Sequence, residues 1–387
     1  MTANRIILIA LWILSLVSIS FFGGPLSYGF FAAVTLVPLI SLLYTLIVLF
    51  RFKIYQDMNR VNVVAGTVSD FYITLQNEDF FPYSGVRIRF FSPFSSIGGI
   101  EEDTEYELLP HSGIRKKTSL VCRYRGEYEV GVKSIILEDY LRIFRITFTN
   151  REPFRLNVLP RIIRPDSLKT LGQTDISSVE SRTDLRETDV TVRDHQNGDG
   201  IRRIHWKASA ASGKLLVRNL TGEEKQGIGI LMDSGRYSDD PSVYLPLENR
   251  LSEVTIALSS YFLDHNTPVR VFFLSSGYAE YSIREPGDFR QFYSDLSALS
   301  FRPENTPEKL MAHLLSDRNV YSLSRMILIL HDPDEAAARA VDQFIRNRIH
   351  VTVYLVTDDT QRAGAEKTFP GDELFVIPTE ADLKEVL

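Results

Sequence analysis

Hydrophobic positions are distributed very unevenly along this chain of 387 residues. Two runs without a charged residue, 6–22 and 26–50, open the sequence and are separated by a Gly-Gly-Pro turn. A helix rises about 1.5 Å per residue and a membrane core is roughly 30 Å thick, so the second run is long enough to span it and the first is at the lower limit. The pattern predicts two transmembrane helices in residues 1–55. A cleaved signal peptide followed by one anchor and a buried soluble helical pair are the alternatives.

Basic residues flank the two apolar runs on one side only. Arg5 precedes the first run, Arg51, Lys53 and Arg60 follow the second, and the connecting turn has none. Because basic residues close to a span stay in the cytoplasm, both ends of the hairpin are expected there. The sequence therefore predicts a multi-pass protein of the cell inner (cytoplasmic) membrane that contacts the lipid bilayer and keeps its soluble domains in the cytoplasm.

Between residues 56 and 160 the pattern changes to short runs of β-branched and aromatic residues separated by turn-forming residues. Charged and apolar positions alternate in several of these runs, which is typical of a sheet with one solvated face. The segment predicts a β-sandwich of the immunoglobulin-like kind. The predicted strands cover residues 68–75, 86–91, 118–125, 128–137 and 142–148.

A polar segment, 161–183, predicts a linker to the last part of the chain. In the α/β domain beyond it, almost wholly apolar runs typical of buried parallel strands alternate with helical patterns. The runs are 227–232, 269–274, 326–330 and 351–356, the helical patterns are 247–263, 288–299 and 334–347, and residues 373–387 predict a last strand and helix. The fold class is therefore multi-domain: a transmembrane helical hairpin, a β-sandwich, and an open parallel α/β sheet within 184–387.

Composition restricts the function classes. With 44% hydrophobic and 24% charged residues, the chain is expected to fold rather than to stay disordered. The net charge of −6 argues against nucleic acid as a partner. Cys122 is the single cysteine, which excludes an intramolecular disulfide framework and a CxxC zinc site and agrees with a reducing compartment.

The candidates for chemistry follow two strands of the α/β domain. Ligands of open α/β sheets bind outside the carboxyl ends of the strands, where Asp233, Ser234 and Asp332 are expected. Their oxygen atoms are ligands that suit Mg²⁺. The alternative is that these acids cap the following helix or bond to the loop backbone. A hydrolase that uses Asp233, His205 or His331 as acid or base is a minor alternative, because no nucleophile, base and orienting group stand at a recognisable spacing.

The least generic segment of the sequence is 184–218. A Gly-Asp-Gly turn at 198–200 precedes an amphipathic stretch in which Ile201, Ile204 and Trp206 are expected to be buried. One interpretation is a packed, ordered insertion before the first sheet strand. The other is a basic docking face for an acidic partner surface or membrane phosphates. The candidate interaction residues are Asp199, Arg202, Arg203, His205, Trp206 and Lys207.

Residues 197–210 read Asn-Gly-Asp-Gly-Ile-Arg-Arg-Ile-His-Trp-Lys-Ala-Ser-Ala, and Gly-Lys-Leu at 213–215 and Val-Arg at 217–218 follow. This run resembles the signature of the bacterial "domain of unknown function 58" family. Residues 125–128, Arg-Gly-Glu-Tyr, followed by 139–145 resemble the upstream β segment of that family. The segment departs from the family at 140–142, where Tyr-Leu-Arg stands in place of the usual Pro-Phe-Gly.

The resemblance covers nearly the whole chain and implies a von Willebrand factor A-like C-terminal domain in an inner-membrane protein, with a MoxR-type AAA+ ATPase as partner. It implies no established enzymatic activity, so we expect a non-enzymatic, membrane-anchored interaction protein in the assembly or maturation of a complex. A cell-envelope scaffold that acts through the β-sandwich is the alternative. In von Willebrand A domains, a metal-ion-dependent adhesion site has the pattern Asp-x-Ser-x-Ser after the first strand. Only Asp233 of this pattern is present here, since Gly235 and Tyr237 replace the serines.

Overall fold

The computed structural model describes residues 2–59, 62–101, 104–150, 152–168, 190–195, 204–220, 227–332, 335–357 and 374–387. The chain divides into two compact units, Met1–Arg161 and Ile162–Leu387. This division falls one residue beyond position 160, where the sequence pattern ends the β-rich segment. Residues 169–183 of the predicted linker lie outside the described residues, whereas Ile163 and Leu168 are buried in the core of the second unit.

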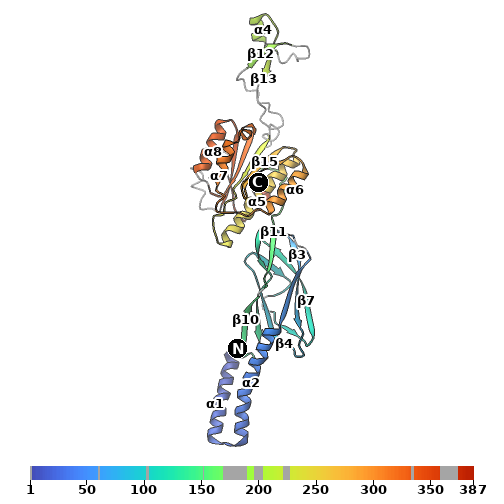
Figure 1. Cartoon of the computed structure of the whole chain (residues 1–387), viewed down its shortest axis with the longest axis vertical. Helices are drawn as coiled ribbons and strands as arrows, with labels where there is room; N and C mark the ends of the chain where they lie inside the picture. The colour runs from blue at the N-terminus through green and yellow to red at the C-terminus, as the bar shows by residue number, and fades with distance from the viewer. Residues whose placement is uncertain are drawn as a thin grey trace. The chain divides into compact units, whose positions relative to one another are not determined.

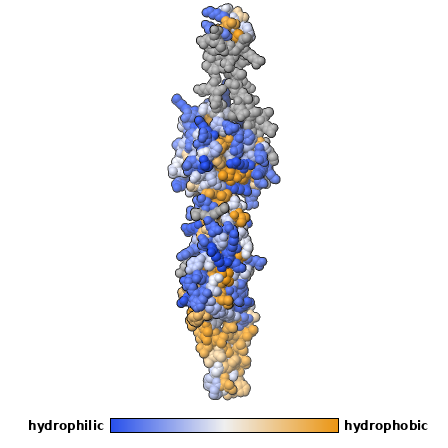
Figure 2. Space-filling model, turned by 90° about the vertical axis from the view of Figure 1, so that its right-hand side faces the viewer, coloured by the Kyte–Doolittle hydropathy of each residue, from blue (hydrophilic) through white to orange (hydrophobic). Residues whose placement is uncertain are grey.

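The first unit begins with two antiparallel helices, α1 (Thr2–Phe21) and α2 (Gly24–Arg51), shown in Figure 1. Both are long and apolar enough to cross a membrane. Gly23 and Gly24 make the turn between them with positive φ angles of 57° and 82°. In the most apolar 18-residue stretches of α1 and α2, only 6% and 11% of the residues are buried, so these helices do not form the core of a soluble domain. Figure 2 shows their surface as predominantly hydrophobic, which suits helices that anchor the chain in a membrane.

The rest of the first unit consists of short strands around one hydrophobic core. Three sheets have the orders β1-β3-β7-β5, β10-β9-β4-β6 and β2-β11-β8. Neighbouring strands are antiparallel except β2 and β11. The strands are β1 (Lys53–Met58), β2 (Val63–Val64), β3 (Val68–Asn77), β4 (Tyr83–Phe90), β5 (Ser95–Gly98), β6 (Tyr106–Leu108), β7 (Ser112–Cys122), β8 (Gly126–Val130), β9 (Val132–Glu138), β10 (Arg145–Thr149) and β11 (Phe154–Leu159).

Alternation in β3 shows why these sequences form sheets. Phe71, Ile73 and Leu75 are buried in the core, and the residues between them are partly or fully exposed. A strand places successive side chains on opposite faces, so this period of two buries one face of the strand and leaves the other wet.

Glycine and turn conformations shorten two of the predicted strands. The predicted strand 128–137 is divided into β8 and β9 at Gly131, whose φ is 81°. The predicted strand 142–148 begins only at Arg145, because Arg142 has a φ of 52° in the preceding turn. Strands β1, β2, β5, β6 and β11 were not predicted. Strands β2, β5 and β6 have four residues or fewer, whereas β11 alternates apolar and polar residues and was recognisable in the sequence.

The second unit is built on a six-stranded sheet with the order β16-β15-β14-β17-β18-β19. All neighbours are parallel except the edge pair β15 and β16. The elements are β14 (Ile228–Met232), α5 (Pro241–Asp264), β15 (Val269–Leu274), β16 (Tyr278–Ile283), α6 (Pro286–Ser297), α7 (Pro307–Ser316), the 3₁₀ helix η2 (Arg318–Ser322), β17 (Arg325–Leu330), α8 (Glu335–Arg346), β18 (His350–Val356), β19 (Leu374–Ile377) and α10 (Leu383–Val386). The predicted open α/β sheet is present, although β16 and α7 were not predicted.

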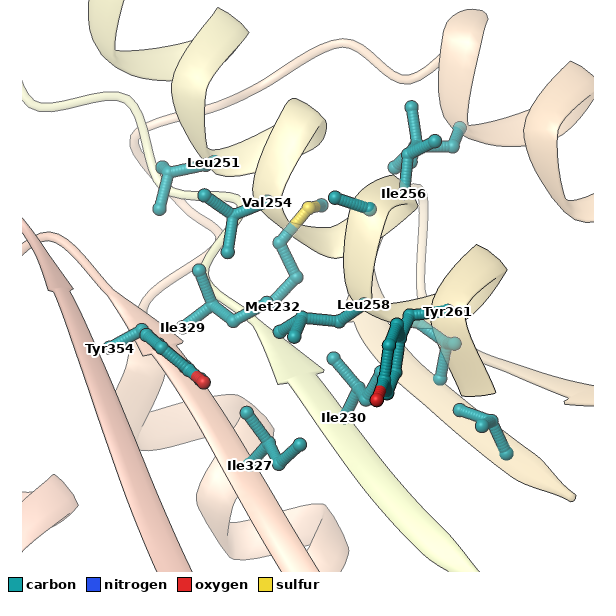
Figure 3. Close-up of a cluster of buried hydrophobic side chains, with 14 of the residues drawn as sticks. Ile230, Met232, Leu251, Val254, Ile256, Leu258, Tyr261, Ile327, Ile329 and Tyr354 are labelled. Atoms are coloured by element: carbon teal, nitrogen blue, oxygen red, sulfur yellow. The ribbon is translucent and has the colours of Figure 1, made fainter. Parts of the chain in front are cut away.

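Helices cover both faces of this sheet, α5 and α6 on one side and α7 and α8 on the other (Figure 1). Ile230 and Met232 of β14 pack with α5, as Figure 3 shows, whereas Leu231 belongs to the cluster with α7 and α8. Because alternate residues enter different cores, a central strand must be apolar at every position. This requirement explains the continuous hydrophobic runs in the sequence.

A further sheet of the second unit contains β12 (Val190–Asp194) and β13 (Leu216–Leu220), which are antiparallel. The short helix α4 (Trp206–Ser212) precedes β13 and ends at Gly213, whose φ is 68°. Residue Ser209 ties the helix to the strand, since its hydroxyl accepts a hydrogen bond from the Leu216 amide at 2.9 Å. The C-terminal part of the signature segment is therefore an ordered helix and strand.

Candidate functional site

The candidate site is the loop that follows β14 at the centre of the six-stranded sheet. If the strands are numbered along the chain from β14, their spatial order is 3-2-1-4-5-6, and the order reverses between β14 and β17. Ligands of open α/β sheets bind at such a switch point, outside the carboxyl ends of the strands. Asp233 follows β14 and His331 follows β17, so two of the residues singled out in the sequence lie at this point.

Three groups of the protein donate hydrogen bonds to the carboxylate of Asp233. Its Oδ1 accepts from the amide of Gly235 at 2.9 Å. Its Oδ2 accepts from the hydroxyl of Tyr237 and from the amide of His331 at 3.4 Å. The ring centroids of Tyr237 and His331 are 4.8 Å apart in an edge-on arrangement. The carboxylate therefore links its own loop to the end of β17.

Burial determines the acidity of this group. Asp233 is only 1% exposed, and burial raises the pKa of its carboxyl from the usual 3.8 to about 6. The hydrogen bonds from Tyr237, Gly235 and His331 oppose this rise because they stabilise the charged form. At neutral pH the carboxylate is ionised, and these three hydrogen-bond donors stabilise its buried charge.

The two departures from the adhesion-site pattern have a structural reason. At Gly235, a Cβ atom would lie 3.0 Å from the carbonyl oxygen of Asn305 and 3.1 Å from Oδ1 of Asp233, so a serine does not fit without a shift. At Tyr237, the longer side chain brings its own hydroxyl to the Asp233 carboxylate. A protein hydroxyl thus contacts the carboxylate directly.

The rest of the loop is fixed to α5. The guanidinium of Arg236 pairs with both carboxylate oxygens of Glu248, at 2.7 and 3.2 Å, and lies over the ring of Tyr244 at 4.1 Å. Asp240 caps α5 by accepting a hydrogen bond from the Ser242 amide at 2.9 Å, which lowers the pKa of the Asp240 carboxyl. Sequence reasoning missed Arg236 and Glu248, because residues twelve positions apart show no local pattern.

The residues predicted to bind Mg²⁺ bond to other groups of the protein or are exposed. The hydroxyl of Ser234 donates to the carbonyl of Leu274 at 2.7 Å, and Asp332 is exposed. Asp233 already accepts three hydrogen bonds. Within the part of the chain that the structure describes, no group of three or more His, Cys, Asp or Glu residues is placed to hold a metal ion. Bonding to the loop backbone, the alternative to a metal site, matches the contacts of Asp233, and binding of Mg²⁺ stays a prediction.

The candidate acid and base residues have structural contacts. Nδ1 of His331 lies 2.8 Å from the carbonyl of Val356, to which it donates. His205 caps α4, since its Nδ1 accepts from the Ala208 amide at 3.1 Å. The structure brings His331 to Asp233 through its backbone amide and not through its ring. This contact joins the end of β17 to the Asp233 loop.

A cavity of about 390 Å³ lies beside the Asp233 loop. Asn305 lines the cavity and also contacts the loop, because its side-chain amide donates to the carbonyls of Leu274 at 3.1 Å and Ser234 at 3.5 Å. Most of the lining residues are uncharged, and the others are the cationic Arg302 and Lys309, the imidazole of His313 and the acidic Glu304. The cavity therefore offers two cationic groups at the carboxyl ends of the strands.

The predicted interaction residues of the signature segment are described only in part. Asp199, Arg202 and Arg203 lie outside the described residues. The expectation that Trp206 is buried is wrong: its side chain is 63% exposed at the start of α4, whereas Ile204 is buried. A seven-residue helix packed on one strand has only one covered face, and Trp206 and Lys207 are both on its exposed surface.

No protein-family model matches this chain, and no curated protein matches it. The cupredoxin domain of amoB from Nitrosocaldus yellowstonii aligns with 30% of this chain and 96% of its own, at 9% identity and a TM-score of 0.20. A GH20 exo-β-N-acetylglucosaminidase from Vibrio harveyi aligns with 83% of this chain and 59% of its own, at 11% identity and a TM-score of 0.15. Cwp6 from Clostridium difficile aligns with 81% of this chain and 38% of its own, at 13% identity and a TM-score of 0.16. Likenesses this weak carry no argument about function.

Proposed function

We propose that this chain is a non-enzymatic, membrane-anchored interaction protein whose second unit binds a cytosolic MoxR-type AAA+ ATPase. The partner is proposed from the resemblance to the domain-of-unknown-function 58 family. The binding surface is the carboxyl end of the six-stranded sheet. The observation that carries this proposal is the Asp233 carboxylate, which is engaged by Gly235, Tyr237 and His331 and fixes the strand-end loop in one conformation.

A rigid loop beside a cavity with two cationic groups suits recognition of a protein surface. Preorganised loops lose little conformational entropy on binding, so more of the contact energy contributes to affinity. Arg302 and Lys309 line the cavity and complement an acidic side chain of a partner. We assign the second unit a von Willebrand factor A-like fold, and its strand order with one antiparallel edge strand supports this assignment.

The proposed location is the inner membrane, with the sheets of the first unit and the whole second unit in the cytoplasm. Arg5 and Arg51 stand at the ends of α1 and α2 that lie beside the sheets of the first unit. Since basic residues favour the cytoplasmic side, this end of the hairpin and the sheets attached to it belong there.

Crosslinking in intact membranes followed by purification of the full chain tests the partnership. We expect mass spectrometry to identify an AAA+ ATPase in the crosslinked product. The double variant Arg302→Glu/Lys309→Glu should lose it, because two repulsive charges then face the acidic partner. The control is Arg290→Glu, a charge reversal at an exposed position of α6 away from the cavity. Repeated absence of an ATPase, or equal loss in the variant and the control, would contradict the proposal.

A further inference from the structure

The sheets of the first unit contact both membrane helices through two loops. The juxtamembrane loops are residues 78–82, between β3 and β4, and residues 139–144, between β9 and β10. On α1, the side-chain amide of Asn4 donates to the Leu141 carbonyl at 2.7 Å, and Nε of Arg5 donates to the Ile143 carbonyl at 2.7 Å. Both contacts involve the second loop, so the start of α1 is fixed to it.

Three contacts attach α2 to the same loops. The hydroxyl of Ser41 donates to the buried carboxylate of Asp139, which also accepts from two amides of its own loop. One turn further on, the hydroxyl of Tyr44 donates to the Pro82 carbonyl at 2.9 Å. Two turns beyond that, Nε of Arg51 lies 2.5 Å from Oδ1 of Asp79. The end of α2 is therefore bound to both loops by hydrogen bonds and an ion pair, while Val48 enters the core of the sheets.

These contacts place the juxtamembrane loops at the level of the membrane surface. Arg5 immediately precedes the charge-free run of α1, so it marks one end of the hydrocarbon span. On α2, Ser41 lies about 25 Å along the helix from Gly24 at a rise of about 1.5 Å per residue, which is close to the thickness of a bilayer core. Residues 139–144, which contact Arg5 and Ser41, are therefore at the boundary between hydrocarbon and headgroups. The end of the other loop lies beside them, because the Pro82 carbonyl accepts a hydrogen bond from the Tyr140 hydroxyl.

The juxtamembrane loops expose apolar side chains at this level. Phe80 is 81% exposed, Tyr140 is 57% exposed and Leu141 is 42% exposed. The ring of Tyr140 lies 5.3 Å from that of Tyr44 on α2, and its hydroxyl donates to the Pro82 carbonyl at 3.2 Å. Aromatic side chains with one apolar and one polar end are typical of the membrane interface.

We propose that the juxtamembrane loops insert Phe80, Tyr140 and Leu141 into the interfacial layer of the bilayer that the hairpin spans. The ligand of this surface is the lipid itself, because the surface continues directly from the helix ends. The first unit is then fixed on the membrane at a defined height and not suspended from a flexible tether. This inference depends on the membrane-spanning hairpin of the proposed function and adds a second, peripheral contact to it.

Tryptophan fluorescence of the full chain in liposomes with brominated lipids tests this contact. The chain has two tryptophans, Trp12 in α1 and Trp206. In Trp206→Phe, the remaining Trp12 reports on the hairpin alone. In Trp12→Phe/Trp206→Phe/Phe80→Trp, the new tryptophan reports on the loop. The matched control carries Val68→Trp in the same background, since Val68 is 70% exposed at the opposite end of β3.

We expect lipids brominated near the headgroup to quench Phe80→Trp, lipids brominated along the acyl chains to quench Trp12, and neither kind to quench Val68→Trp. If Trp12 is quenched and Phe80→Trp behaves like Val68→Trp, the loop contact is refuted while the membrane hairpin stands. If Trp12 itself is not quenched, the spanning hairpin and the loop contact fail together. An emission from Phe80→Trp that is blue-shifted but not quenched would indicate cover by protein, such as a second copy, and would also overturn the proposal.

Discussion

The substitution Tyr237→Phe removes one hydroxyl from the strand-end loop. Tyr237 donates that hydroxyl to the Asp233 carboxylate, which is 1% exposed. Gly235 and His331 remain as donors in the variant. Because a phenylalanine ring keeps the edge contact with His331, the change isolates the contribution of the hydrogen bond to the stability of the loop.

The expected cost follows from the charge of the acceptor. A hydrogen bond to a charged group contributes about 1.5–3 kcal/mol, so we expect the free energy of unfolding of the second unit to fall by about 2 kcal/mol near neutral pH. For a unit of this size, that loss lowers the melting temperature by about 4–8 °C.

The cost should depend on pH with a definite sign. The folded-state pKa of Asp233, about 6, lies above its usual 3.8, so the folded state binds more protons than the unfolded state between these values. The stability linked to Asp233 is therefore fully present below about pH 4 and is lost as the pH rises through 6. Without the Tyr237 hydroxyl, the pKa of Asp233 rises further and the loss extends to higher pH. The difference between wild type and variant should thus be small at about pH 5 and largest at about pH 8.

Guanidinium unfolding of the fragment 162–387, followed by circular dichroism at these two pH values, measures the difference. Tyr278→Phe is the matched control, because among the described residues the buried hydroxyl of Tyr278 has no hydrogen-bond partner. Its removal should be neutral or slightly stabilising. An equal cost of Tyr237→Phe at both pH values, or a cost of Tyr278→Phe as large as that of Tyr237→Phe, would refute the reasoning.

Two further predictions concern the first unit. Gly131→Ala should destabilise it by about 2 kcal/mol or more, because the new Cβ would lie 2.2 Å from Oε1 of Gln56, which accepts a hydrogen bond from the Val132 amide. Gly66 also has a positive φ but faces open space, so the control Gly66→Ala should cost only about 1 kcal/mol. Thermal unfolding of the full chain in detergent compares the two variants, and equal shifts would count against the steric argument. Cys122 is fully buried, and burial raises the pKa of its thiol, so a thiol reagent should label it only after unfolding in guanidinium. Rapid labelling of the native chain would contradict this.

The first and last parts of the fold were predictable because their signals are contiguous. A membrane helix requires an unbroken apolar run, and residues 6–22 and 26–50 have one each. A central parallel strand is apolar at every position because it serves two cores, which residues 227–232 show. The middle of the chain was less predictable, since strands such as β2 and β6 have only two and three residues, too few to show an alternating pattern.

Only part of the candidate site could be predicted from the sequence. The position of Asp233 after the first strand of the sheet indicated a site at the sheet edge, and Asp233 does lie at the point where the strand order reverses. The role of Tyr237 could have been suspected from its place in a loop where serine is expected. The partners Glu248 and Asn305 had no local signal, because their contacts to the loop depend on how α5 and residues 301–306 pack against the sheet.

The sequence by itself determined where the chain is apolar throughout, where it alternates and where it turns, because these properties belong to contiguous segments. It therefore determined the helical hairpin and the alternation of buried strands with helices in the second unit, although it did not indicate every strand. Only the tertiary structure decided what each polar side chain contacts. Ser41 meets Asp139 across 98 positions, and His331 meets Asp233 across the same separation. Such pairs form because packing buries a carboxylate and brings a donor to it from a distant segment, and no periodicity along the chain records that choice.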